Sequence, residues 1–325
     1  MSNPSTLAGL GEAEVLRRIL PIVPDAAGAL LGPGDDAAVV AAPDARYVVT
    51  TDMMIQGPDF RLAWSSPHDL GFKAAVSNLA DVVAMGAVPT ALVVAIAAPG
   101  DTHVDTLTGI AQGLRDACEA LAPGCGVVGG DLSVSPTLTI AVTAFGDLEG
   151  RAPVLRSGAR PGDVVAVSGR LGAAAHGLRL LFEQGVDASG TPDAARASDL
   201  RLRHPDEVAA QLAPQPPLAD GPRAAVAGAT AMMDLSDGLA IDARRMARAS
   251  GVAIDLDASA VGDRTSLDGG EDHSLLATFP AGADRPHGFR RIGVVREGEG
   301  LLVDGERYDG LGGWDPYAGW NGVGG

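Results

Sequence analysis

The sequence predicts an α/β protein built from two domains. Strand and helix patterns alternate along the chain instead of forming blocks of one kind. The 325 residues exceed what one hydrophobic core usually holds. A turn-rich stretch at 151–163 interrupts the alternation. We therefore expect an N-terminal α/β domain over residues 1–149 and a C-terminal α/β domain over residues 150–325.

In the N-terminal half, β-branched and apolar runs predict strands, and apolar residues at helical spacing predict helices. Glycine, proline or acidic residues close each run. The expected strands lie at 47–51, 91–98, 126–128 and 138–145, and the expected helices lie at 69–85 and 104–121. The strand at 126–128 leads into Gly129, Gly130 and Asp131, which predict a turn. Paired glycines also let backbone amides approach a phosphate.

The C-terminal half repeats the alternation. Strands are expected at 164–167, 231–233 and 252–256, and helices at 171–182 and 239–249. The region 183–219 is polar, contains several prolines and has weak periodicity. Residues 310–325 are rich in glycine and predict an irregular tail.

Charge and cysteine content exclude several partners. The chain has 24 basic and 41 acidic residues, a net charge of −17, and such a body repels nucleic acids and anionic membranes. The uncharged apolar run 91–98 is less than half the length of a membrane span. Cys118 and Cys125 have no histidine at zinc-ligand spacing, which indicates free thiols in a reducing cytosol. We expect a cytoplasmic protein that binds neither nucleic acid nor membrane.

Lysine is not an available source of charge for binding phosphates. Lys73 is the only lysine in the chain. Its surroundings, Gly71-Phe72-Lys73-Ala74, lack the Gly-Lys-Ser/Thr ending of a P-loop. The chain also lacks the His-Arg-Asp catalytic loop of protein kinases. A polyanionic substrate therefore needs another source of positive charge.

Five acidic segments punctuate the predicted strands and helices. They are Gly34-Asp35-Asp36, Thr50-Thr51-Asp52, Asn78-Leu79-Ala80-Asp81, Gly129-Gly130-Asp131 and Asp234-Leu235-Ser236-Asp237-Gly238. Carboxylates that converge in one cleft cannot all stay ionised without a cation. Mg²⁺ suits such oxygen donors, because it bridges one or two carboxylates to substrate phosphates.

Each segment alone also has an ordinary structural interpretation. Asp35 and Asp36 are suited to an Asx turn, and Asp237 is suited to a helix N-cap. Asp81 is equally compatible with an exposed helix face. The joint occurrence of the segments, rather than any one of them, favours a metal and phosphate site.

Seven motifs extend this pattern. They are Gly34-Asp35-Asp36-Ala37-Ala38, Thr51-Asp52, the run 73–87, Gly129-Gly130-Asp131, the run 156–163, Asp234-Leu235-Ser236-Asp237-Gly238-Leu239 and Gly269-Gly270-Glu271-Asp272. In this order and spacing, over residues 11 to about 317, the chain resembles the thiamine-monophosphate kinase family. The resemblance implies the two-domain α/β fold of aminoimidazole-ribonucleotide synthetase-like proteins. It also implies a homodimer formed through the sheet of the N-terminal domain.

The same resemblance implies ATP as co-substrate, thiamine monophosphate as acceptor and a cluster of Mg²⁺ ions around the ATP phosphates. Metal ligands are expected at Asp36, Thr50, Thr51, Asp52, Asp81, Asp131, Asp234 and Asp237, ATP contacts at Gly130, Asp131, Arg156 and Ser236, and acceptor contacts at Asp59, Glu271 and Trp314. A carboxylate opposite a cationic thiazolium and a stacked tryptophan suit this acceptor. The alternatives are a surface ion pair for Arg156 and packing within the tail for Trp314.

The reaction implied is direct in-line transfer of the γ-phosphoryl group of ATP, giving thiamine diphosphate and ADP. No general base is expected, because a phosphate monoester is largely dianionic at neutral pH. The six histidines are scattered singly, and His273 is the one most expected to face the site.

The chain departs from the family pattern at four places. Asp59 stands where the family has histidine, and Leu132-Ser133-Val134 replaces Thr-Thr-Arg. His273-Ser274 replaces Tyr-Glu, and Pro316 follows Asp315 where His-Phe is usual. All four lie toward the acceptor or the edge of the expected site, so they are expected to affect acceptor affinity before nucleotide binding.

Two other functions fit the same motifs. A ligase-type or synthetase-type member of the superfamily would share the acidic segments but would release phosphate from ATP. A non-catalytic protein that binds thiamine phosphates would bind ligand without converting it.

Overall fold

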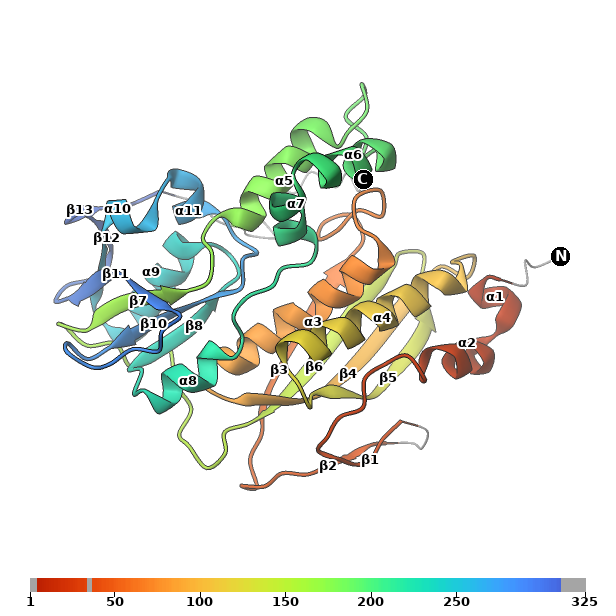
Figure 1. Ribbon diagram of the computed structural model, residues 1–325, viewed down its shortest axis with the longest axis horizontal. Helices are drawn as coiled ribbons and strands as arrows, with labels where there is room; N and C mark the ends of the chain where they lie inside the picture. The colour runs from red at the N-terminus through yellow and green to blue at the C-terminus, as the bar shows by residue number, and fades with distance from the viewer. Residues whose placement is uncertain (1–4, 34–36, 311–325) are drawn as a thin grey trace.

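Two large β-sheets and a small two-stranded one organise residues 5–33 and 37–310, which the computed structural model describes (Figure 1). The first sheet has four strands in the order β3-β6-β4-β5. Their bounds are Val48–Ile55 for β3, Thr139–Asp147 for β6, Val88–Ala98 for β4 and Gly126–Val134 for β5. Strands β4 and β5 are parallel, and the other neighbouring pairs are antiparallel. Strands β3 and β5 are therefore the two edges of this sheet.

Two long helices, α3 (Pro67–Ala84) and α4 (Val104–Leu121), cover one face of the first sheet (Figure 1). Helix α3 begins with a capping box, in which Ser66 and Asp69 each accept a hydrogen bond from the other's backbone N–H. It is buried on nearly every side, because the first sheet, α4 and elements of the second half all contact it. Helix α3 is thus the central helix of the molecule.

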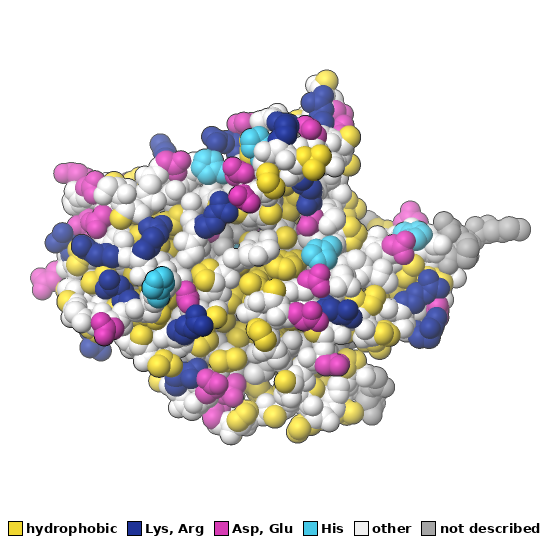
Figure 2. All heavy atoms as spheres, in the orientation of Figure 1, with side chains coloured by type: hydrophobic (Ala, Val, Ile, Leu, Met, Phe, Trp, Pro, Cys, Tyr) yellow, Lys and Arg dark blue, Asp and Glu magenta, His cyan; other side chains and the backbone are white. Residues whose placement is uncertain are grey.

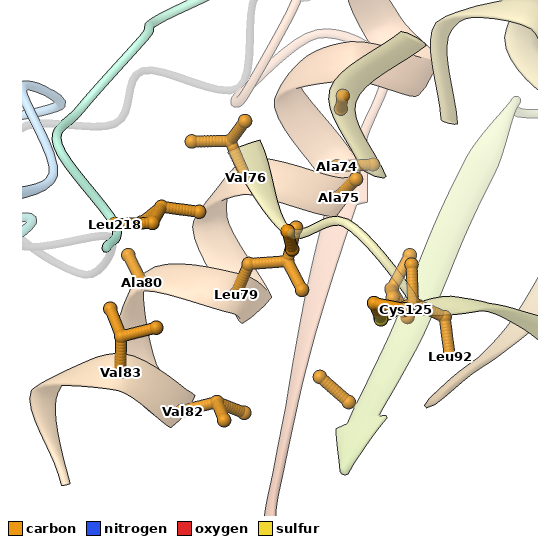
Figure 3. Packing of buried hydrophobic residues seen from close by; sticks show 14 of the residues in the cluster. Ala74, Ala75, Val76, Leu79, Ala80, Val82, Val83, Leu92, Cys125 and Leu218 are labelled. Atoms are coloured by element: carbon orange, nitrogen blue, oxygen red, sulfur yellow. The ribbon is translucent and has the colours of Figure 1, made fainter. Parts of the chain in front are cut away.

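The largest hydrophobic core surrounds α3. Figure 3 shows α3 side chains, among them Val76 and Leu79, between Leu218 on one side and Leu92 with Cys125 on the other. Leu218 belongs to the second half of the chain, whereas Leu92 lies on β4 of the first sheet. The two halves therefore share one apolar core, which fixes their relative position.

The second sheet has seven strands in the order β13-β12-β9-β11-β7-β10-β8. The bounds are Val164–Ser168 for β7, Ala231–Leu235 for β8, Ala253–Leu256 for β9, Ser274–Phe279 for β10, Phe289–Arg296 for β11, Gly300–Val303 for β12 and Glu306–Arg307 for β13. Only β12 and β9 pair in parallel. Helix α9 (Leu239–Ser250) follows β8 and packs on this sheet.

The remaining elements are short. They are α1 (Leu7–Leu10), α2 (Glu12–Ile19), the two-stranded β1 (Ala29–Leu31) and β2 (Val39–Val40), α5 (Ala173–Gln184), α6 (Ala194–Arg203), α7 (Pro205–Leu212), α8 (Asp220–Val226), α10 (Ala258–Val261) and α11 (Arg264–Asp268). Helices α5, α6 and α7 form a group above α3 in Figure 1.

The turn predicted at Gly129, Gly130 and Asp131 is wrong. All three residues lie inside β5 and pair with β4. A glycine pair weakens a strand but does not end it when a neighbouring strand supplies the hydrogen bonds. Strand β8 likewise extends two residues beyond its predicted end and includes Asp234. The weakly periodic region 183–219 contains α6 and α7, whose outer faces are polar.

Surface and membrane properties follow from the same elements. Among the residues that the structure describes, no helix combines the length and apolar character needed to cross a bilayer. On the face shown in Figure 2, acidic and basic side chains are interspersed around apolar side chains near the centre. Cys118 and Cys125 are both free and buried.

Helices α3 and α4 approach each other through glycines. A Cβ atom on Gly71 would lie 1.9 Å from the carbonyl oxygen of Ile110, and one on Gly113 would lie 2.0 Å from that of His68. No larger residue fits at either position unless the helices separate.

We expect Gly113→Ala to lower the free energy of unfolding by about 2 kcal/mol, because overpacking against a backbone carbonyl outweighs the gain in helix propensity. Urea unfolding measures the change. Gly32→Ala is the control, since an added Cβ there meets nothing within 4 Å. Unchanged stability of Gly113→Ala would contradict the close approach of the two helices.

Candidate active site

A cavity of about 1170 Å³ lies between the two sheets. Its lining comes from β3, α3, α5, β8 and the segment 268–273. Seven of the site residues that the sequence predicts line this cavity: Asp52, Asp59, Asp81, Asp234, Ser236, Asp237 and Glu271. The fold therefore brings together acidic residues that are far apart in the chain.

The N-terminal half contributes Asp52 and Asp81. Side chains alternate along β3, so Thr50 and Asp52 point to the face covered by α3. The Thr50 hydroxyl donates a hydrogen bond of 2.8 Å to Asp81 on α3. The backbone N–H of Asp52 donates to the side-chain oxygen of Asn78, one turn earlier on α3, at 2.9 Å. Two hydrogen bonds thus fix β3 against the acidic side of α3.

The C-terminal half contributes Asp234 at the end of β8 and Asp237 in the turn before α9. Gly238 in this turn has a φ of 116°, which favours glycine. Asp237 is ion-paired with Arg245, which also binds the fully buried Asp242. The Asp242 carboxylate in turn accepts from the backbone N–H of Asp237 at 3.2 Å. Asp242 and Arg245 therefore hold the turn that presents Asp237.

The segment 269–273 forms the opposite wall of the cavity. Glu271 and His273 have φ values of 70° and 50°, in the left-handed region that non-glycine residues rarely occupy. Their backbone N–H groups bond to the carbonyls of Ser236 and Leu235 at 2.7 and 3.0 Å. The Asp272 carboxylate accepts from backbone N–H groups at the start of α5. This network holds the backbone of residues 271–273 at the cavity wall.

The carboxylates of the cavity crowd one another. Burial, and then the neighbouring Asp234, raise the pKa of Asp81 to about 7. Burial also raises the pKa of Asp52; His273 opposes this shift, and Asp234, Glu271 and Asp237 add to it. A raised pKa of a carboxyl group means that its surroundings disfavour the ionised form. The cavity is therefore short of positive charge.

This donor set suits Mg²⁺. The carboxylates and the Thr50 hydroxyl are hard oxygen donors, which this ion prefers. Within residues 5–33 and 37–310, no three His, Cys, Asp or Glu side chains are gathered closely enough to hold one ion by themselves. That spacing is compatible with Mg²⁺, which usually takes one or two carboxylates and completes its shell with water and phosphate oxygens.

Lys73 lines the same cavity. The sequence motifs show only that it is not the lysine of a P-loop. Its ammonium forms an ion pair with Glu271. Burial alone would raise the pKa of Glu271, but the charges of Lys73 and His273 bring it below its ordinary value. The sequence signal that marks this position is a lysine inside the otherwise apolar run 70–76, because such a charge is rarely buried without a partner.

His273 and Asp59 also border the cavity. His273 lies with Nδ1 3.5 Å from Asp234 and Nε2 3.2 Å from the Ser77 hydroxyl. The Asp59 carboxylate accepts from the backbone N–H of Ile55 at 2.7 Å, and burial raises its pKa. Two of the residues that depart from the family pattern thus sit beside the acidic cluster.

Other expected site residues lie elsewhere. Gly130 and Asp131, on the edge strand β5, line a second cavity of about 810 Å³. Thr51 faces away from α3, and its hydroxyl donates to the carbonyl of Val142 at 2.9 Å. Arg156 is exposed and does not line the first cavity. Asp36 and Trp314 lie outside the described residues.

Comparison with known proteins defines the class to which this fold and site belong. Two sequence profiles match the chain: "AIR synthase related protein, N-terminal domain" over residues 34–148 and "AIR synthase related protein, C-terminal domain" over residues 160–284. The chain is thus of the AIR synthase related class.

Individual relatives narrow this class. The thiamine-monophosphate kinase of Mycobacterium tuberculosis H37Rv is 45% identical over 330 residues, covering 96% of this chain and 93% of the relative. That of Corynebacterium glutamicum is 42% identical, covering 89% and 87%. The chain belongs to the thiamine-monophosphate kinase family.

Solved structures agree. The structure described as "AaThiL complexed with AMPPCP and TMP" matches with a TM-score of 0.72 and 32% identity, covering 86% of this chain and 90% of that chain. Thiamine-monophosphate kinase from Stenotrophomonas maltophilia matches with a TM-score of 0.72 and 31% identity, covering 91% and 96%. These matches confirm the expected two-domain AIR synthase-like fold.

We expect Asp81→Asn to raise the melting temperature of the protein in EDTA by about 2 to 4 °C, because an amide keeps the acceptor for Thr50 without a buried charge. Differential scanning calorimetry measures the shift. Asp101→Asn, at an exposed position, is the control and should leave the melting temperature unchanged. A lower melting temperature for Asp81→Asn would contradict mutual repulsion in the cavity.

Proposed function

We propose that the chain transfers the γ-phosphoryl group of ATP to thiamine monophosphate, giving thiamine diphosphate and ADP. The observation that carries this proposal is the cavity in which Asp52, Asp81 and Asp234 face one another beside Glu271. In this proposal the reaction takes place at the boundary between the N-terminal domain (residues 1–149) and the C-terminal domain (residues 150–325). The likeness to a structure complexed with AMPPCP, an ATP analogue, and TMP supports the choice of both substrates.

Mg²⁺ is the cation that the acidic cavity is built to hold. Asp52, Asp81, Asp234 and Asp237, with the Thr50 hydroxyl, would hold a cluster of Mg²⁺ ions together with the substrate phosphates, and Asp36, Thr51 and Asp131 would complete the set expected from sequence. When bound, Mg²⁺ offsets the negative charge of the two substrates. Arg245 and Asp242 keep Asp237 oriented toward the cavity. The crowding that raises the pKa of Asp81 supports a cation at this place.

The residues of the chain position the substrates for in-line attack and do not remove a proton. The acceptor phosphate is largely dianionic at neutral pH, so it attacks without a general base. His273 contacts Asp234 and Ser77, which fix its ring beside the acidic cluster. We assign it no role in proton transfer. Ser236, Gly130, Asp131 and Arg156 contact ATP, whereas Asp59, Glu271 and Trp314 contact thiamine monophosphate.

A homodimer accounts for the expected site residues that lie outside the first cavity. Strands β3 and β5 are the two edges of the first sheet among the described residues, and apolar side chains on them are exposed, Met53 by 57% and Val134 by 79%. A twofold axis places β3 of one copy beside β5 of the other, which closes both edges. Asp131 of one copy then adjoins Thr51 and Asp52 of its partner.

The buried free thiols Cys118 and Cys125 support a cytoplasmic protein. In the cytosol, glutathione and thioredoxin keep cysteine thiols reduced.

Incubation with ATP, Mg²⁺ and thiamine monophosphate, followed by chromatography, tests the reaction. We expect equimolar thiamine diphosphate and ADP, with Asp52→Asn lowering turnover at least about 100-fold because transition-state charge loses its support. Exposed Asp101→Asn is the matched control and keeps wild-type turnover. Release of inorganic phosphate without thiamine diphosphate would favour a synthetase-type relative, and binding without conversion would favour a sensor.

Subunit complementation tests the shared site. Asp52→Asn and Asp131→Asn homodimers should both be inactive, whereas a heterodimer purified through two different tags contains one intact site and one doubly altered site. We expect that heterodimer to show about half of wild-type activity. An inactive heterodimer would place both residues in the site of their own chain.

A further inference from the structure

Lys73 is the one lysine of the chain, and it is buried beside the acidic cavity. Its side chain is 7% exposed. Burying an ammonium is costly unless it is paired and hydrogen-bonded. We therefore expect the buried Lys73 ammonium to have partners whose interactions offset the cost of its desolvation.

Those partners come from two other parts of the fold. The ammonium forms an ion pair with Oε2 of Glu271 and donates a hydrogen bond of 3.1 Å to the backbone carbonyl of Gln211 on α7. Lys73 itself lies on α3. One side chain thus joins the central helix to the cavity wall at Glu271.

The ion pair is asymmetric. The Glu271 side chain is 35% exposed, whereas that of Lys73 is nearly enclosed. Oε1 of Glu271 accepts no hydrogen bond from the described residues, and the residue lines the cavity. The ammonium holds one carboxylate oxygen and leaves the other available to a molecule bound in the cavity.

Backbone geometry makes this support necessary. Glu271 has a φ of 70°, and its backbone N–H donates a hydrogen bond to the carbonyl of Ser236. A glutamate side chain has three rotatable bonds, so the backbone alone does not fix the carboxylate. Of the described groups, the Lys73 ammonium is the one that fixes its far end.

We propose that Lys73 is a positioning residue for the acceptor. It holds the Glu271 carboxylate against the cationic thiazolium ring of thiamine monophosphate, and it does not itself contact the transferred phosphoryl group. This inference rests on the proposed function. It assigns to the only lysine a role in acceptor affinity that is separate from phosphate binding.

Kinetics of four variants test the proposal. Lys73→Met should raise KM for thiamine monophosphate about tenfold, with KM for ATP within about twofold of wild type. Lys73→Arg should restore most of the affinity. The double variant Lys73→Met with Glu271→Gln should be no worse than Glu271→Gln alone, because Lys73 acts through Glu271. A normal KM in Lys73→Met, or losses that multiply in the double variant, would overturn the proposal.

A measurement on the wild-type protein covers the case in which a variant fails to fold. Isotope-labelled lysine gives one side-chain resonance per subunit, since Lys73 is the only lysine. Thiamine monophosphate without ATP should shift this resonance, and a resonance that does not move on saturation would overturn the proposal. The outcomes separate the two claims: a wild-type protein that makes no thiamine diphosphate contradicts the proposed function, whereas an active protein with an unaffected Lys73→Met contradicts only the role of Lys73.

Discussion

Repulsion between carboxylates that the fold forces together is the constraint on which the site depends. Helix α3 packs against both sheets, so Asp81 on this helix meets Asp52 from β3 and Asp234 from β8. The shared apolar core around α3 holds these elements in place. Packing energy therefore maintains an arrangement of charges that is unfavourable by itself. In the function proposed here, Mg²⁺ would offset the negative charge of both the carboxylates and the substrate phosphates, so a chain with one lysine could bind two phosphate-bearing substrates.

The elements with strong periodicity were predictable from sequence. The helix expected at 104–121 is α4 without change, because its apolar stripe faces the sheet and its ends carry clear signals. The elements that were missed depend on distant partners. Gly129 and Gly130 read as a turn, yet β4 supplies the ladder that keeps them extended. Helices α6 and α7 show weak periodicity because only a narrow face of each is buried against α5 and its surroundings.

For the site, sequence motifs identified the residue types, and the structure supplies their grouping. The acidic motifs predicted one cluster, but β3 and β5 are opposite edges of the same sheet, so Asp52 and Asp131 are separated within one chain. Strand order is not visible in motif spacing, because it depends on pairings between distant segments. Sequence motifs test Lys73 only as a phosphate ligand. Its partner Glu271 is almost two hundred residues away, and a contact of that kind leaves no local signal.

Diffraction from crystals grown with Mn²⁺ and AMPPCP, at a wavelength where manganese scatters anomalously, tests the central claim most directly. The account predicts anomalous peaks between Asp52, Asp81 and Asp234, in contact with the phosphates of the nucleotide. A nucleotide bound elsewhere, or manganese with no ligand among these side chains, would contradict it.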